Sequence, residues 1–194
     1  GASEPSAGRA TAPPAPPALD EAAKPWRADE IVPNLWLGNL AFANSLPLLR
    51  QHGITHVVNV TPSRNSFPDV VQYYQVPVED DCGVDLLPHL CGAIQFIQAA
   101  LGEGTHEVCA PRARLGAAGG GDGDAPALVV VRRVLAHCRE GASRSVAVVL
   151  AYLMRCRGLR LADALELVRS RRPPSAVTRP NKGFMRQLGA LEGP

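Results

Sequence analysis

The chain has 194 residues, a size that suits one domain with a core large enough to fold alone. Hydrophobic residues make up 46% of it, yet no uninterrupted apolar stretch approaches the roughly 20 residues that a membrane-spanning helix needs. The formal net charge of +2 argues against a dedicated nucleic-acid surface, which usually carries dense basic clusters. We therefore expect neither a membrane span nor a nucleic-acid partner.

The N-terminus has neither an apolar signal region nor a basic lead, and the chain begins with Gly1 rather than Met. This start indicates a chain that was processed, tagged or excised from something longer. Five cysteines occur without the pattern of a small disulfide scaffold. Such a content favours free thiols in a reducing compartment, and we expect the cytoplasm or the nucleus.

Three cysteines and two histidines are the candidate metal ligands of the sequence. Their spacing matches no paired Cys-x-x-Cys site, and two of them fall within an expected helix. We therefore expect no metal and no other cofactor. The five candidates are Cys82, His89, Cys91, His106 and Cys109.

Composition divides the chain into a tail and a domain. Residues 1–28 are rich in Ala, Pro and Ser, a composition that cannot bury a core and predicts a disordered or polyproline-like segment. The folded domain is expected over 29–192, interrupted at about 102–127 by a Gly-rich stretch without periodicity. A surface insertion of this length has a low entropic cost, although a spliced-in or unprocessed segment would look the same.

Alternating strand and helix signals occupy the rest of the domain. The segment "IVPNLWLG" (31–38) predicts a strand pair around a Pro-Asn turn, closed by Gly38, and Gly53 is expected to end the first helix. Apolar runs predict buried strands at 55–60, 73–78 and 127–136. Helices are expected at 44–52, 86–101 with Asp85 as cap, 145–156, 161–172 and 180–192. This order predicts an α/β fold, a central mostly parallel sheet flanked by helices on both faces.

The stretch "HCREGASRS" (137–145) lies between the last expected strand and a helix that is apolar on all sides. A strand that ends in a tight loop before a buried helix aims backbone N–H groups and the positive end of the helix dipole at one point. That point is an anion site, and Arg144 adds a planar fork of donors suited to two phosphate oxygens. The expected phosphate-binding residues are Arg139, Glu140, Gly141, Ala142, Ser143 and Arg144.

Cys138 is expected at the bottom of this pocket, where the groups that bind phosphate also stabilise a thiolate. We expect it to attack phosphorus and form a cysteinyl-phosphate, with Ser145 donating to the thiolate as it leaves. The alternative is a structural cysteine beside a chance arginine, but strand, cysteine, glycine turn, arginine and apolar helix all occur in the required order. His137 is expected to hold the loop and tune the thiol rather than to carry protons.

These residues resemble the signature H-C-x-x-G-x-x-R-S/T of the cysteine-dependent protein phosphatases, specifically the dual-specificity group. The blocks "IVPNLWLGN", "GITHVVNVT", "VPVEDD", "AYLMR" and "RPNKGFMRQL" follow the order of those catalytic domains. The resemblance covers roughly residues 29–192 apart from the insertion. It implies the dual-specificity phosphatase fold and hydrolysis of phosphotyrosine and of phosphoserine or phosphothreonine.

A general acid is needed because the serine, threonine or tyrosine oxygen of the substrate is a poor leaving group unless it is protonated as it departs from phosphorus. The segment "VPVEDDCGVDLL" follows a strand and offers four carboxylates, Glu79, Asp80, Asp81 and Asp85. Asp85 is taken as a helix cap, and chemistry alone ranks Asp80 and Asp81 nearly equal. By resemblance to the family block of strand, Asp, five residues and Leu, Asp80 matches the acid and Leu86 the leucine. Asn181 matches an asparagine that the family uses to brace the loop.

The substrate stays open at this stage. "VEDDCGVDLL" resembles slingshot-type phosphatases, which act on cofilin-type actin regulators, whereas "NVTPS" resembles the MAP-kinase phosphatases equally well. The resemblance therefore implies phosphorylated protein partners, a MAP kinase or a cofilin-type regulator among them. A phosphoinositide or RNA 5′-phosphate phosphatase is a second reading, although Glu140 offsets Arg139. A non-catalytic phosphoprotein-binding pseudophosphatase is a third, although cysteine, arginine and acid are all present.

Overall fold

The computed structural model describes residues 27–102 and 131–192. The predictions for residues 1–26 of the Ala/Pro-rich tail and for almost all of the Gly-rich insertion fall outside these ranges, as do the candidate metal ligands His106 and Cys109. Ala28, expected in the tail, is the first residue of a strand.

The described residues form a five-stranded sheet with strand order β1-β2-β5-β3-β4. Strand β1 pairs antiparallel with β2, and the other neighbours are parallel. The mostly parallel sheet of the expected α/β fold is therefore confirmed. The strands are β1 (Ala28–Val32), β2 (Leu35–Asn39), β3 (His56–Asn59), β4 (Gln72–Gln75) and β5 (Val134–Cys138).

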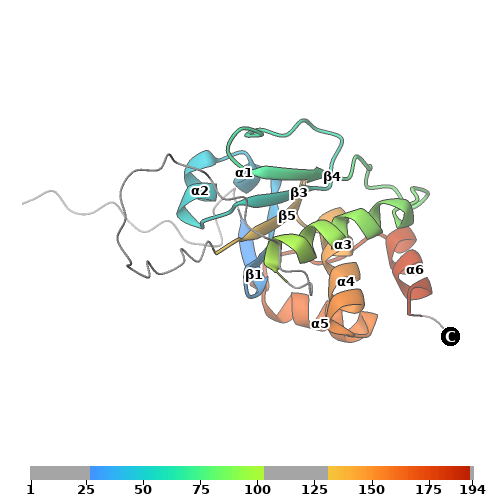
Figure 1. Ribbon diagram of the computed structural model, residues 1–194. Helices are drawn as coiled ribbons and strands as arrows, with labels where there is room; N and C mark the ends of the chain where they lie inside the picture. Colours follow the sequence, from blue (N-terminus) through green and yellow to red (C-terminus); the bar gives the residue numbers. More distant parts are fainter. Residues whose placement is uncertain (1–26, 103–130, 193–194) are drawn as a thin grey trace, which may run out of the picture.

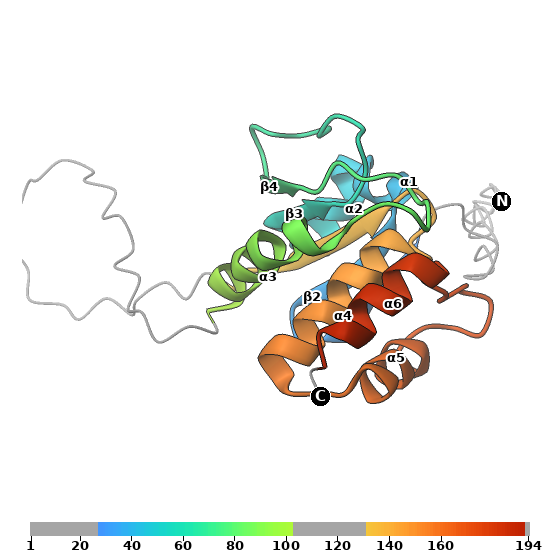
Figure 2. The same cartoon turned by 90° about the vertical axis from the view of Figure 1, so that its right-hand side faces the viewer.

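Helices cover both faces of this sheet (Figure 1). Two short helices pack on one face and four longer ones on the other, where α4 lies among α3, α5 and α6 (Figure 2). No helix in the described ranges is long and apolar enough to cross a membrane. The helices are α1 (Leu40–Ala43), α2 (Leu46–Gln51), α3 (Leu87–Leu101), α4 (Arg144–Arg157), α5 (Leu161–Ser170) and α6 (Lys182–Ala190).

Several element boundaries differ from the sequence prediction. The first expected helix, 44–52, is α2, which begins only at Leu46. It is preceded by the unpredicted helix α1, which Asn39 caps by accepting from the Phe42 N–H at 3.0 Å. The final strand starts at Val134 instead of residue 127. Asp85 lies one residue before the N-cap of α3, yet its Oδ1 still accepts from the Leu87 N–H at 3.1 Å.

Strand β5 divides the core into two clusters. Val134, Ala136 and Cys138 face the larger cluster with the long helices, whereas Leu135 faces the smaller cluster beneath α1 and α2. All five residues of the strand are buried because both faces of the sheet are covered. Because β5 is the central strand, its last residue, Cys138, lies at the carboxyl end of the sheet with a strand on either side.

Candidate active site

The loop 139–143 leaves β5 at the edge where the parallel strands end. The register pairs Cys138 with Asn39 of β2 and His137 with Asn59 of β3, so three strands finish side by side. The buried helix α4 starts at Arg144, immediately after this loop. Carboxyl ends of parallel strands facing a helix N-terminus are a common place for ligands in α/β proteins, because free N–H groups converge there.

Gly141 allows the turn that this loop makes. Its φ is +70°, in the left-handed region, and a Cβ at this position would lie 2.7 Å from the carbonyl oxygen of Gly38. That oxygen belongs to the backbone of β2 and has little freedom to move. The close approach seats the loop directly on the neighbouring strand.

We expect Gly141→Ala to lower the free energy of unfolding by about 2–5 kcal/mol, because left-handed strain and overpacking both act on it. The matched control is Gly158→Ala at the end of α4, where φ is +65° and nothing lies within 4 Å of the added Cβ. The control should lose only about 1–2 kcal/mol from strain. Urea unfolding of both variants measures the difference, and equal losses would contradict a tight contact between Gly141 and β2.

Cys138 is buried, with its Sγ 3.3 Å from the Ser145 Oγ. Burial acts to raise the pKa of this thiol. Hydrogen bonds from the Ser145 hydroxyl and from the N–H groups of Ser145, Ser143 and Gly141 outweigh burial, so the pKa lies below its ordinary value. The arrangement supports a thiolate near neutral pH, as a nucleophile requires.

His137 is buried on the opposite side of β5. Its Nδ1 lies 3.4 Å from the carbonyl oxygen of Cys138. Burial lowers the pKa of His137 to about 4, against a weaker opposing effect of that carbonyl. The imidazole is therefore neutral at pH 7, which suits a role in holding the loop better than one in proton transfer.

Arg144 connects the loop to the segment that carries the expected acid. Its Nη1 donates to the carbonyl of Val78 at 3.1 Å and lies 3.7 Å from the Glu79 Oε2. Its Nε is buried and has no partner within residues 27–102 and 131–192. Because buried donors are nearly always satisfied, this N–H favours an acceptor supplied by a ligand.

A hollow of about 280 Å³ adjoins this guanidinium. The sequence offered Glu79 as one of four carboxylates on the segment of the expected acid, but gave no sign that it lies beside Arg144. The lining residues are Leu40, Thr61, Pro62, Ser63, Glu79, Arg139 and Arg144. The lining therefore combines the buried guanidinium of Arg144 with a second cation, Arg139, and one carboxylate, Glu79.

Asp80 and Asp81, nearly equal by chemistry, lie in different surroundings. The Asp80 Oδ1 accepts from the Ser143 hydroxyl at 2.6 Å and from the Asn181 Nδ2 at 2.9 Å, which joins it to the loop 139–143. The Asp81 Oδ1 accepts from the Gly83 N–H at 2.7 Å and so supports its own turn. Of the two carboxylates, Asp80 is the one that these bonds bring to the cysteine loop.

Asn181 is hydrogen-bonded to both the loop 139–143 and Asp80. It caps α6 by accepting from the Phe184 N–H, and its own N–H donates to the Ser143 Oγ at 3.0 Å. Gly183 lies in the first turn of α6, where any side chain would overlap the backbone of Cys82. The start of α6 is therefore packed directly against the segment that carries Asp80.

Three of the five metal candidates, Cys82, His89 and Cys91, lie within the described residues. Within residues 27–102 and 131–192, no group of three or more His, Cys, Asp or Glu residues could hold a metal ion. Cys82 and Cys91 are both exposed and belong to different elements, the acid segment and α3.

Comparisons with known proteins agree with this geometry. The family model "Dual specificity phosphatase, catalytic domain" matches residues 130–193. Protein phosphatase Slingshot homolog 3 of Mus musculus is 36% identical over 168 residues, which cover 86% of this chain and 21% of that protein. Dual specificity protein phosphatase 26 of Bos taurus is 35% identical over 171 residues, which cover 85% of this chain and 67% of that protein.

Solved structures give the same result for the fold. The crystal structure of human DUSP28 matches with a TM-score of 0.65 and 33% identity, over 85% of this chain and 92% of that one. A mouse putative dual specificity phosphatase, complexed with zinc tungstate, matches with a TM-score of 0.68 and 34% identity, over 91% of this chain and 92% of that one. The chain spans about a fifth of the length of the Slingshot homologue.

Proposed function

This chain belongs to the family of dual-specificity protein phosphatases, and from that premise we propose that it hydrolyses phosphotyrosine and phosphoserine or phosphothreonine in proteins. The observation that carries the proposal is the hydrogen bonding of the Cys138 sulfur by loop and helix N–H groups, which lowers the pKa of a buried thiol. A second support is the link between Asp80 and this loop through Ser143.

The proposed hydrolysis has two chemical steps. The Cys138 thiolate attacks phosphorus, and the bond from phosphorus to the substrate oxygen breaks as Asp80 gives that oxygen a proton. Arg144 and the loop N–H groups hold the three phosphoryl oxygens on which negative charge is spread. Water then attacks the cysteinyl-phosphate and gives a proton to the Asp80 carboxylate, while the bond from sulfur to phosphorus breaks and inorganic phosphate is released. The Ser145 hydroxyl stabilises the departing thiolate.

The wall of the hollow disfavours highly charged substrates. Glu79 lies 3.7 Å from Arg144, and Glu140 follows Arg139 in the loop, so each cation beside the pocket has a carboxylate close to it in space or in sequence. A phosphoinositide or a triphosphorylated RNA end brings several negative charges that these carboxylates repel. A phosphorylated side chain brings only one phosphate.

The partners that fit this chemistry are phosphorylated proteins, which would give the chain a role in signal transduction. The resemblances to slingshot-type and MAP-kinase phosphatases name a cofilin-type actin regulator and a MAP kinase as candidates, and we propose neither above the other. Free thiols at Cys82, Cys91 and Cys138 fit a reducing compartment, the cytoplasm or the nucleus.

Turnover of three substrate classes tests the proposal. The protein is given phosphopeptides that carry phosphotyrosine or phosphothreonine, an inositol phospholipid in detergent, and an RNA with a 5′-triphosphate. We expect kcat/KM for the phosphopeptides to exceed the other two by more than about tenfold, since like charges at the pocket oppose the polyanions. Faster release of phosphate from the lipid or the RNA would assign the chain to the alternative class, and no turnover of any substrate would favour a binding protein.

A further inference from the structure

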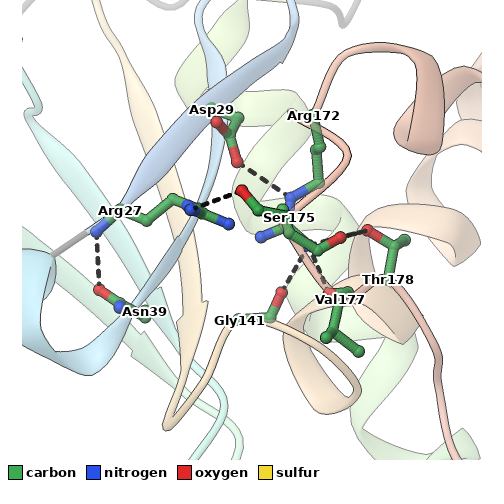
Figure 3. Close-up of polar contacts among 9 residues, drawn as sticks. Arg27, Asp29, Asn39, Gly141, Arg172, Ser175, Val177 and Thr178 are labelled. Atoms are coloured by element: carbon green, nitrogen blue, oxygen red, sulfur yellow. Dashed lines mark hydrogen bonds and ion pairs between the residues drawn. The ribbon is translucent and has the colours of Figure 1, made fainter. Parts of the chain in front are cut away.

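The side chain of Arg172 is almost completely buried, with 2% of its surface exposed, and lies just beyond α5. Its Nε donates to the Asp29 Oδ2 at 3.0 Å, and its Nη1 donates to the carbonyl of Gly141 at 2.9 Å (Figure 3). The same Nη1 also contacts the Val177 carbonyl and the Thr178 hydroxyl, each at 3.0 Å. One guanidinium thus joins strand β1, the phosphate-binding loop and the segment before α6.

The bond to Gly141 bears on the loop's phosphate-binding N–H groups. A peptide unit is planar, so its carbonyl and the N–H of the next residue point in opposite directions. The adjacent peptide illustrates this: the Ala142 carbonyl accepts from the Arg179 N–H at 2.9 Å, while the Ser143 N–H binds the Cys138 sulfur. By the same geometry, holding the Gly141 carbonyl turns the Ala142 N–H away from Arg172 and toward the pocket side.

Asp29 keeps this guanidinium in place. It lies on β1, and its side chain is 14% exposed, so both members of the ion pair are shielded from water. A buried charge is stable only when it is paired and hydrogen-bonded, and here the fork of the arginine meets both needs at once. A lysine has no such planar fork, so it would bind either Asp29 or the Gly141 carbonyl well but not both at once.

We propose that Arg172 is a positioning residue for phosphoryl transfer, which through Asp29 and the Gly141 carbonyl fixes the phosphate-binding loop with its N–H groups toward the substrate. The effect of Arg172 on catalysis rests on the proposed function. The loop geometry itself has readouts that need no turnover: the affinity for a phosphate-like oxyanion and the reactivity of the Cys138 thiol.

The test compares Arg172→Met, Arg172→Lys and Asp29→Asn with Arg171→Met, whose side chain is exposed one position earlier. We expect kcat/KM for an aryl phosphate to fall about 100-fold in Arg172→Met, the scale of a displaced catalytic geometry. The affinity for tungstate, measured from how well it protects Cys138 against iodoacetate, should weaken about tenfold. The pH midpoint of Cys138 alkylation by iodoacetate should rise by about one pH unit, because loop N–H groups stabilise the thiolate. Arg172→Lys and Asp29→Asn should change the same three quantities less, and Arg171→Met none of them.

A purely structural role gives a different pattern. The urea midpoint of Arg172→Met would fall, while the alkylation profile and the tungstate affinity of the folded protein would stay at wild type, and this would overturn the proposal. If Arg172→Met does not fold, Arg172→Lys and Asp29→Asn decide: unchanged values in both also overturn it. If wild type turns over no phosphate ester, the proposed function fails, and the alkylation and tungstate measurements still decide the position of the loop.

Discussion

Replacing the sulfur of Cys138 by oxygen in Cys138→Ser is expected to lower kcat for an aryl phosphate by more than about 10⁴-fold, the scale seen when a covalent nucleophile is removed. The N–H groups of Gly141, Ser143 and Ser145 lower the pKa of a thiol, whereas an alcohol stays protonated at neutral pH and attacks phosphorus slowly. The rest of the pocket is unchanged by this substitution. Phosphopeptide binding should therefore persist, within about threefold of the wild-type affinity, since Arg144 and the loop N–H groups supply it.

Hydrolysis of an aryl phosphate and calorimetric titration with a phosphotyrosine peptide measure the two effects separately. The control is Cys91→Ser, an exposed thiol on α3, which should turn over like wild type. If Cys138→Ser kept more than about a hundredth of the wild-type kcat, the covalent step would not run through this sulfur. The inactive variant, if it binds, also serves to capture phosphorylated partners from a lysate.

The parts of the fold with local signals were predictable from sequence. A β-branched run, a cysteine, a glycine turn and an all-apolar helix are consecutive in the chain, and each follows its own periodicity or turn chemistry. The structure accordingly places Cys138 at the end of β5 and α4 over Arg144–Arg157, buried from Arg144 to Met154. The exact start of β5 was missed, because "ALVVV" is as apolar as the strand that follows it.

Contacts between segments that are distant in the chain have no such local signal in the sequence. Arg172 is one of three arginines in "RSRR" (169–172), and only the packed structure distinguishes the buried one from its exposed neighbour Arg171. The bond from Ser143 to Asp80 joins residues 63 positions apart. Chemistry alone could not rank Asp80 above Asp81, since both are acidic residues on the same loop, and the family resemblance was needed to choose.

The second large effect concerns Asp80, and its size should depend on the leaving group. Asp80→Asn keeps an oxygen that can accept from Ser143 and Asn181, so the loop should stay in place while the transferable proton is lost. For phosphotyrosine peptides, whose leaving oxygen needs protonation, we expect kcat to fall about 10²–10³-fold, within the usual range for general acid catalysis. For an activated aryl phosphate, whose leaving group departs as an anion, the loss should be less than about tenfold.

A plot of log kcat against the basicity of the leaving group, over a series of aryl phosphates, measures this dependence. The slope of the plot should be shallow for wild type and steep for Asp80→Asn. The matched control is Asp81→Asn, which alters only the turn that ends at Gly83 and should keep the shallow slope. Equal slowing of good and poor leaving groups by Asp80→Asn would remove Asp80 from the role of acid. A steep slope for Asp81→Asn instead would identify Asp81 as the proton donor. The segment that carries both residues would then have to reorient before the reaction, because Asp80 is the carboxylate bonded to Ser143.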